Sequence, residues 1–264
     1  MGKPIVSDEL WAEIEPLLPA SKPSRWKYPG RRPVSDRAAL TRIVFVLRTG
    51  IRWRDLPAEM GCGSGVTCWR RLRDWQHELL LAQVARRRPD RLLASGRRLI
   101  IHSCGWGGRK TGPNPTDRAR PGSKHHIATD ANGIPVAAIL TGANCNDVTQ
   151  LLPLVDAIAP IRGVRGRPLQ KPEAIYADRG YDSERHRQEL RERGITPVLA
   201  KRGTAHGSGL GKYRWIVERT HAWLRHFRRL RIRFERRGDI HEAFLKLGCC
   251  LICWNTLRRA EPSF

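Results

Sequence analysis

Two acidic side chains lie where the sequence could support chemistry. Asp178 ends a predicted strand in the run YADRGYDS, and Glu218 lies on a predicted helix in the run YRWIVERTHAWLRHFRRLR. A carboxylate at the carboxyl end of a strand stands where the active sites of α/β sheets usually form. Glu218 is the single acid in that basic helix, although an intrahelical pair with Arg214 or Arg225 would also explain it. These two carboxylates are the candidate catalytic residues.

The chain is strongly basic. Its 264 residues include 49 Lys and Arg against 25 Asp and Glu, a formal net charge of +24. Residues 201–237 hold twelve Lys and Arg but only Glu218 and Glu235, so the net charge of this stretch is 12 − 2 = +10. A solvated helix would mix signs, and this imbalance is typical of a surface that binds a polyanion. The charge predicts a nucleic-acid partner without saying which kind.

The first part of the chain has helical periodicity. Ser7 is predicted to cap a helix that runs to about Leu18. Ser35 is predicted to cap a second helix over 36–49, which Gly50 closes. We therefore expect a helical N-terminal region.

A basic helix follows these two, in the run VTCWRRLRDWQHELLLAQVARRR. Two helices, a turn containing Gly and a final basic helix are compatible with helix-turn-helix recognition of duplex DNA. Arg70, Arg71 and Arg73 are then the predicted DNA contacts. A helical bundle with a basic solvent face would explain this segment equally well.

The periodicity changes at about residue 97. A strand candidate RRLIIHS and a hairpin in KHHIATDANGIPVAAILTG come first. The remaining predicted elements are a helix near 148–158, a strand at 173–178, a helix at 183–193, a strand at 195–200, a helix at 212–229 and a core helix at 240–258. This order is that of a ribonuclease-H-like α/β domain. We expect a helical DNA-binding region over 1–94 and the ribonuclease-H-like domain over 95–264.

Cysteine usage and hydropathy indicate the compartment. Seven cysteines, odd in number and irregularly spaced, fit reduced thiols better than disulfides. The pair Cys250 and Cys253 lies in an apolar run and is predicted to be buried rather than metal-bound. The sequence contains no apolar run of about 18 residues and no signal-peptide pattern. We expect a cytoplasmic protein that has no contact with membranes.

Three long runs carry a family resemblance. They are GGRKTGPNPTDRARPGSKHHIATDANGIPVAAILTGANCND, IYADRGYDSERHR and GLGKYRWIVERTHAWLRHFRRLRIR. They resemble bacterial insertion-sequence transposases of the DDE class, of the family-five type. The N-terminal runs SDELWAEIEPLLP and GIRWRDLPAEMG look like the DNA-binding region of that family, so the likeness covers nearly the whole chain.

The resemblance implies an activity and its partners. Members hold two divalent metal ions, usually Mg²⁺ (or Mn²⁺), between three carboxylates of a ribonuclease-H-like core. They cut at the terminal inverted repeats of the element and join the freed 3′ end to target DNA. The implied partner is double-stranded DNA, bound by a dimer, in the nucleoid of a bacterial cytoplasm. Magnesium is a hard ion that prefers oxygen ligands, which explains the carboxylates.

The resemblance also assigns residues. By motif, the second acid corresponds to Asp178 and the third to Glu218. Lys212, Tyr213, Arg214 and Arg225 surround Glu218 in the matching signature and would contact DNA phosphates.

The chain departs from the pattern at the first acid. The family has Asp in its first strand, whereas this chain has IIHSC, with His102 at that place. Imidazole suits Mn²⁺, Fe²⁺ or Zn²⁺ better than Mg²⁺, and the loss of one negative charge weakens a two-metal site. His102 is nevertheless the candidate for the first catalytic and metal-binding position.

No other acid is a good replacement for the missing Asp. Asp130 lies in the predicted hairpin turn, Asp117 in an irregular basic loop, and Asp147 is expected to cap the next helix. His125 and His126 precede the turn and are expected to be exposed.

Two hypotheses remain open. The chain is either an active DDE transposase or a catalytically degraded copy that binds DNA without cutting it because His102 replaces the first acid. An RNA-binding structural protein would explain the charge but not Asp178 and Glu218 within long family motifs.

Overall fold

The computed structural model describes twelve stretches of the chain: residues 4–20, 27, 33–61, 63–76, 98–106, 110, 112–113, 118–119, 121–158, 160, 171–203 and 211–259. For residues 98–106, 211–214, 257 and 259 it describes the backbone alone.

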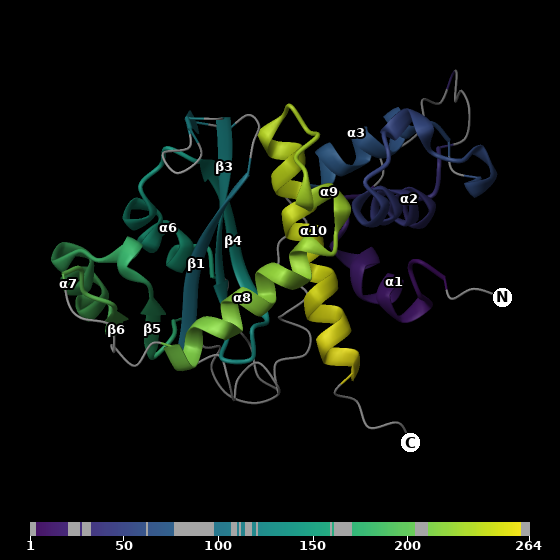
Figure 1. Ribbon diagram of the computed structural model, residues 1–264. Helices are drawn as coiled ribbons and strands as arrows, with labels where there is room; N and C mark the ends of the chain where they lie inside the picture. The colour runs from purple at the N-terminus through teal and green to yellow at the C-terminus, as the bar shows by residue number, and fades with distance from the viewer. Residues whose placement is uncertain are drawn as a thin grey trace.

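A mixed sheet forms the centre of the fold (Figure 1). Its strands are β1 (Arg98–Trp106), β2 (Gly112–Pro113), β3 (Pro121–Thr129), β4 (Pro135–Gly142), β5 (Ala174–Ala177) and β6 (Thr196–Leu199). β3 pairs antiparallel with β1, β2 and β4, whereas β5 pairs parallel with β1, and β6 parallel with β5. The spatial order of the long strands is therefore β4-β3-β1-β5-β6.

Helices pack against this sheet in the expected chain order. They are α6 (Leu151–Asp156), α7 (Glu184–Glu192), α8 (Gly211–Arg225) and α10 (Gly238–Arg259). α6 packs against β3 and β4, α7 against β6, and α8 against β1. In Figure 1 α8 crosses in front of the strands. The antiparallel strands, followed by alternating helices and parallel strands, confirm the ribonuclease-H-like fold that the sequence predicts.

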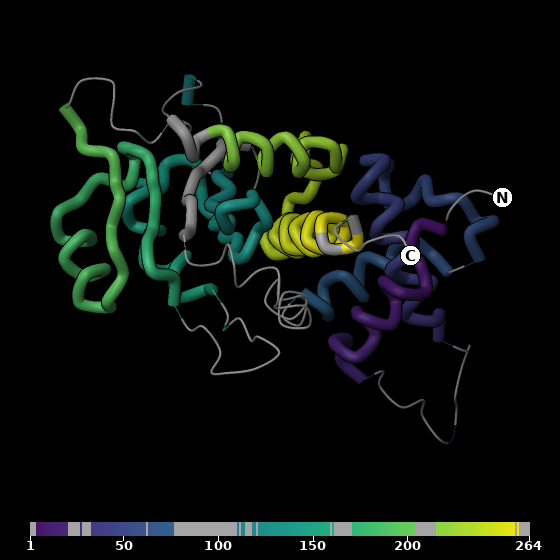
Figure 2. Tube along the Cα trace, turned by 90° about the horizontal axis from the view of Figure 1, so that it is seen from below, coloured from purple at the N-terminus to yellow at the C-terminus, as the bar shows by residue number. Residues whose placement is uncertain are grey.

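α10 is the core helix that the sequence predicts. It contacts β4 on one side and α3 (Gly65–Trp75) of the N-terminal region on the other, and it runs between these two parts in both views (Figures 1 and 2). Phe244, Leu247 and Cys250 are buried, and the Cys253 thiol donates to the Pro135 carbonyl over 3.2 Å. Burial raises the pKa of Cys250 to about 12, which agrees with the predicted structural thiols.

The predicted helix over 212–229 is wrong at its end. α8 stops at Arg225, Phe227 has an extended backbone, and a separate α9 covers Arg228–Arg231. The break lets Phe227 and Leu230 reach α10, where a side-chain carbon on Gly248 would lie 3.3 and 3.0 Å from them. Close packing on a glycine of α10 therefore overrides the continuous helical periodicity.

The N-terminal region is helical, as predicted. It contains α1 (Asp8–Ile14), η1 (Glu15–Leu17), α2 (Asp36–Thr49), η2 (Trp53–Asp55), η3 (Ala58–Met60) and α3 (Gly65–Trp75). Ser7 and Ser35 cap α1 and α2 by accepting from the backbone, and Gly50 ends α2 at φ +75°. These local signals place the helix ends correctly.

The N-terminal helices and the sheet share one hydrophobic core. Its buried members run from Val6 and Leu40 through Leu72 to Ile127 and Phe244. Within the described ranges, no helix is both long and apolar enough to span a bilayer.

His125 and His126 are buried, so the expectation that they are exposed is wrong. β3 lies between β1 and β4, and neighbouring residues of a strand point to opposite faces. His125 faces α10, where its Nε2 lies 2.9 Å from Nε2 of His241. His126 contacts the Tyr181 hydroxyl at 3.1 Å and Thr141 Oγ1 at 2.8 Å. Both faces of the strand are covered, which sequence alternation alone does not reveal.

The His125 and His241 pair is held neutral. Burial, together with the nearby charges of Arg233 and Arg229, lowers the pKa of His241 to about 3. Burial, His241, Arg233 and His126 hold the pKa of His125 well below 6.5. The unfolded chain therefore binds protons that the folded chain does not, so the stability conferred by the pair is present above pH 6.5 and is lost as the pH falls below it.

We predict that the free energy of unfolding, measured by urea titration, falls by about 2 kcal/mol per histidine between pH 7 and pH 5. The double variant His125→Gln/His241→Gln should show a flatter pH profile, whatever its absolute stability. His226→Gln, which alters an exposed histidine, is the matched control and should keep the slope of the unaltered protein. A double variant with the same slope as the control would contradict this explanation.

Candidate active site

Asp178 stands at the carboxyl end of β5. It is exposed and caps the short helix η5 (Arg179–Tyr181), where its Oδ1 accepts the Gly180 N–H over 3.0 Å. The turn after β5 therefore fixes the backbone at Asp178 while the second carboxylate oxygen takes no part in this bond.

His102 lies on β1, next to Asp178 in the ladder. The parallel register pairs Ile100 with Tyr176 and Ile101 with Ala177, so the next residues on the two strands are His102 and Asp178. On the other side of β1, His102 pairs with Ile127. The backbone thus brings the first and second predicted positions to one edge of the sheet, while the imidazole of His102 lies outside the described side chains.

Glu218 lies on α8, which packs against β1. Ile216 and Val217 are buried against Tyr176, two residues before Asp178, and Glu218 itself is exposed. The helical periodicity of the α8 sequence predicts a buried stripe of Trp215, Val217 and Leu224, and the prediction is wrong for Trp215, which is 53% exposed. Among the described side chains of α8, the buried ones are Ile216, Val217, Thr220, His221 and Leu224. Packing of this face brings the segment that carries Glu218 to the strand that ends at Asp178.

The hairpin turn between β3 and β4 anchors α8. Thr220 Oγ1 donates to the Gly133 carbonyl over 2.6 Å, and Arg219 donates to the Asn132 carbonyl. Asp130, fully buried, accepts the backbone N–H groups of Asn132 and Ile134, each over 2.8 Å. Asp130 therefore has the turn role that the sequence predicts, and it fixes the loop on which α8 rests.

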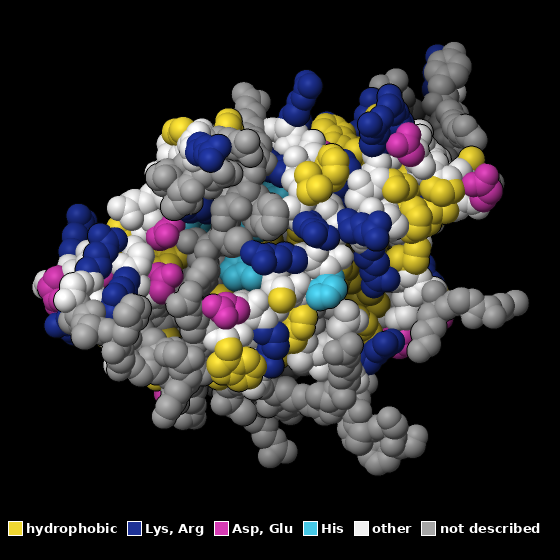
Figure 3. All heavy atoms as spheres, viewed as in Figure 1, with side chains coloured by type: hydrophobic (Ala, Val, Ile, Leu, Met, Phe, Trp, Pro, Cys, Tyr) yellow, Lys and Arg dark blue, Asp and Glu magenta, His cyan; other side chains and the backbone are white. Residues whose placement is uncertain are grey.

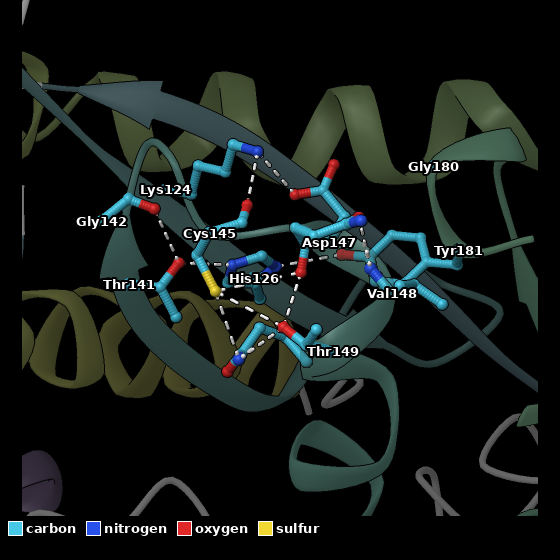
Figure 4. A network of polar contacts seen from close by, with 12 residues as sticks. Lys124, His126, Thr141, Gly142, Cys145, Asp147, Val148, Thr149, Gly180 and Tyr181 are labelled. Atoms are coloured by element: carbon cyan, nitrogen blue, oxygen red, sulfur yellow. Dashed lines mark hydrogen bonds and ion pairs between the residues drawn. The ribbon is translucent and has the colours of Figure 1, made fainter. Parts of the chain in front are cut away.

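A polar network beside Asp178 was not predicted (Figure 4). The Lys124 ammonium donates to Asp147 Oδ1 and to the Cys145 carbonyl, each over 2.9 Å. Asn146, not Asp147, caps the following turn by accepting the Val148 N–H, so the expectation that Asp147 caps the next helix is wrong. Lys124 and Asp147 are 23 residues apart on β3 and η4 (Asp147–Gln150), and no local sequence signal reveals such a pair.

Gly180 lies between the carboxylates of Asp178 and Asp147. A side-chain carbon at this position would lie 3.1 Å from Asp147 Oδ2 and 3.1 Å from Asp178 Oδ1. Asp147 is therefore a close neighbour of Asp178. Lys124 neutralises Asp147 by pairing with its other carboxylate oxygen, Oδ1. The glycine allows both acids to approach the turn after β5.

The donor atoms at this edge fit a divalent cation by type. Asp178 and Glu218 are exposed carboxylates, and oxygen is the ligand that Mg²⁺ prefers. Among the described side chains, no three or more of His, Cys, Asp and Glu are arranged to hold a metal ion. The remaining predicted ligand, His102, is not among those side chains.

The predicted DNA contacts differ in their surroundings. Arg70 is exposed on α3, whereas Arg71 forms an ion pair of 3.0 Å with Asp36 of α2, and Arg73 one of 2.7 Å with Asp74. α2 and α3 pack together, but residues 50–64 between them are longer than the short turn of a helix-turn-helix.

The other predicted contacts lie on α8. Arg225 is exposed in its last turn, and Lys212, Tyr213 and Arg214 lie in its first turn, where only the backbone is described. Figure 3 shows Lys and Arg side chains gathered over α9 and toward the N-terminal helices, with exposed hydrophobic side chains among them.

Two family models match the chain. "Transposase DDE domain" matches residues 93–254, and "Putative transposase of IS4/5 family" matches residues 6–85.

Two individual relatives are named as transposases of insertion sequences. The "Putative transposase for insertion sequence element IS402" of Burkholderia cepacia is 80% identical over 181 residues, which is 69% of this chain and 86% of the relative. The transposase for insertion sequence element IS1106 of Neisseria meningitidis serogroup B is 30% identical over 109 residues, 38% of this chain and 34% of the relative. Among solved structures, the catalytic core domain of BIV integrase gives a TM-score of 0.34 at 12% identity, over 64% of this chain and 87% of that one.

We predict that the Lys124 and Asp147 pair is energetically coupled. Its side chains are 19% and 21% exposed, so a double-mutant cycle with Lys124→Met and Asp147→Asn should give a coupling of about 1 kcal/mol in urea unfolding. The control cycle uses Arg54→Met and Asp55→Asn, a pair at 3.6 Å whose side chains are 74% and 53% exposed. Its coupling should be close to zero. Equal coupling in the two cycles would contradict the prediction.

Proposed function

The chain belongs to the family of DDE transposases of insertion sequences, and from this membership we propose that it cuts the ends of its element at a divalent-metal site formed by Asp178 and Glu218. The observation that best supports this site is the parallel register of β1 and β5, combined with the packing of α8 on β1 and Tyr176. The product of cleavage is a free 3′ hydroxyl, which is then joined to target DNA.

The metal would be held by Asp178, Glu218 and, at the first position of the family pattern, His102. A bound Mg²⁺ or Mn²⁺ supplies positive charge next to the attacking and leaving oxygens of a phosphodiester. A neutral imidazole at His102 makes the site less negative than three carboxylates, which favours Mn²⁺ over Mg²⁺.

Other residues would orient these ligands and the DNA. The Gly180 N–H donates to one oxygen of Asp178. The Lys124 and Asp147 pair supports the turn that carries Asp178 and Gly180. Lys212, Tyr213, Arg214 and Arg225 on α8 would contact phosphates on either side of Glu218. The positive charges of Lys212, Arg214 and Arg225 would hold the scissile strand close to the acids Asp178 and Glu218.

Recognition of the element ends is assigned to residues 1–94 and chemistry to 95–264. Arg70 of α3 is the strongest candidate for a duplex contact because it is exposed. Arg71 and Arg73 border the same face, and the Asp36 pair of Arg71 also fixes α3 against α2. The partner is double-stranded DNA, the terminal inverted repeats first and target DNA second. Joining two ends at once implies a dimer on DNA, in the cytoplasm at the nucleoid.

The comparisons do not favour the alternative, a degraded copy that binds DNA without cutting it. His102 is the residue on which the two hypotheses differ, so variants of this position separate them.

We predict that the unaltered protein cleaves a labelled DNA end of its insertion sequence when Mn²⁺ or Mg²⁺ is added. Asp178→Asn and Glu218→Gln should each lower the cleavage rate by about a hundredfold or more, because each removes a charge that acts on the transition state. The matched control Glu192→Gln, an exposed acid of α7, should cleave at the rate of the unaltered protein.

His102→Asp should increase cleavage in Mg²⁺ more than in Mn²⁺. Cleavage that appears only after His102→Asp would overturn the proposal in favour of the degraded copy. Cleavage that persists in Glu218→Gln would show that Glu218 is not a metal ligand.

A further inference from the structure

A concave site lies away from the acids, between the N-terminal helices and the segment that contains α9 and the residues after it. Its cavity has a volume of about 510 Å³. The residues that line it are mostly arginines and aromatics: Arg52, Arg54, Arg229, Arg236, Arg237, Trp53, Trp69, Phe234 and Glu235. Five cations and one acid give the lining a net charge of 5 − 1 = +4.

The floor of the cavity is closed by internal bonds. Arg229 and Glu235 are 4% and 8% exposed and pair over 2.6 Å. The Trp53 indole donates to the same Glu235 oxygen over 3.2 Å, and Arg229 also donates to the Gly50 and Ile51 carbonyls. The one acid of the cavity is thus neutralised within the fold, and it does not repel an anionic ligand.

The rim is cationic and exposed. Arg52, Arg54 and Arg236 are exposed, and Arg237 pairs with Asp239 while its guanidinium lies 5.5 Å from the ring of Trp69. Arginine forks at a rim match phosphate oxygens, which they can contact in pairs. The rim is therefore suited to a phosphate.

Phe234 is an exposed aromatic surface in this basic setting. Its side chain is 50% exposed, and the Arg229 guanidinium lies 4.8 Å from its ring centroid. Leaving half of a phenylalanine in water is unfavourable unless something covers it. A ring next to arginines is the arrangement on which unpaired nucleic-acid bases stack.

We propose that this cavity binds one unpaired nucleotide of a DNA strand, with its base stacked on Phe234 and its phosphate on Arg52, Arg54 and Arg236. A concave site of this volume accepts a ligand of nucleotide size. An intact duplex is too wide to enter and could touch only the rim, which would leave Phe234 uncovered. The proposal rests on the proposed function only in that the ligand is DNA.

The place of the cavity agrees with this ligand. Trp69 of α3 belongs to its wall, one residue before the predicted duplex contact Arg70. A strand that leaves a duplex held at Arg70 would therefore pass this cavity. The site would hold a nucleotide that has left the base-paired stack, apart from the metal-binding edge of the sheet.

The test measures binding of a fluorescein-labelled oligothymidylate, and of a duplex of equal length, by fluorescence anisotropy in the absence of metal. Phe234→Ala should weaken single-strand binding about tenfold and leave duplex binding within about twofold, because stacking is lost and the charges remain. Phe234→Trp should restore single-strand affinity. Ile232→Ala, which truncates an equally exposed side chain outside the cavity lining, is the matched control and should bind as the unaltered protein does.

Unchanged single-strand affinity in Phe234→Ala would overturn the proposal, and so would equal losses for both DNA forms. As a measurement without substitution, 5-bromodeoxyuridine in the oligonucleotide should crosslink on irradiation to peptides that contain Trp69 or Phe234. Crosslinks confined to other peptides would also overturn it. This test is read by binding in the absence of metal, whereas the cleavage proposal is tested by Asp178→Asn and Glu218→Gln in the presence of metal, so failure of the cleavage proposal and failure of this one give different results.

Discussion

The arrangement of the candidate active site depends on the parallel pairing of β5 with β1. This register makes His102 and Asp178 the first residues beyond the paired segment, at one edge of the sheet. The turn that follows is short, and the absence of a side chain at Gly180 admits the carboxylates of Asp178 and Asp147 together. A shift of one residue in this ladder would turn the side chains of the strand to the other face and separate the acids.

The packing of α8 and α10 places the segment that carries Glu218 against the sheet and links the sheet to the N-terminal region. Ile216 and Val217 of α8 are buried against Tyr176, whereas Glu218 on the same helix is exposed. The break after Arg225 then turns the chain so that Arg229 and Glu235 form a buried pair beneath Trp53. A buried ion pair is tolerated when its hydrogen bonds are satisfied, and the carbonyls of Gly50 and Ile51 complete this one. This ion pair and its hydrogen-bond partners form the floor of the proposed nucleotide site.

Local signals in the sequence predicted much of the fold. The caps at Ser7 and Ser35, the end of α2 at Gly50 and the turn at Asp130 follow from bonds within a few residues, and all are confirmed. Burial of His125 and His126 was missed because helix and turn residues distant in sequence cover both faces of β3. The same reason explains the exposure of Trp215, the break after Arg225 and the Lys124 and Asp147 pair. The sequence predicted Asp178 and Glu218 from motifs, but their neighbours are set by tertiary packing.

The proposed active site requires that Asp178 and Glu218 hold the same metal ion. Anomalous scattering from crystals soaked in Mn²⁺ tests it most directly, because the signal locates the ion without reference to activity. We expect an anomalous peak in contact with carboxylate oxygens of both residues, next to His102 of β1 and the carboxyl end of β5. A peak that touches only one of them, or manganese bound elsewhere with this edge empty, would contradict it.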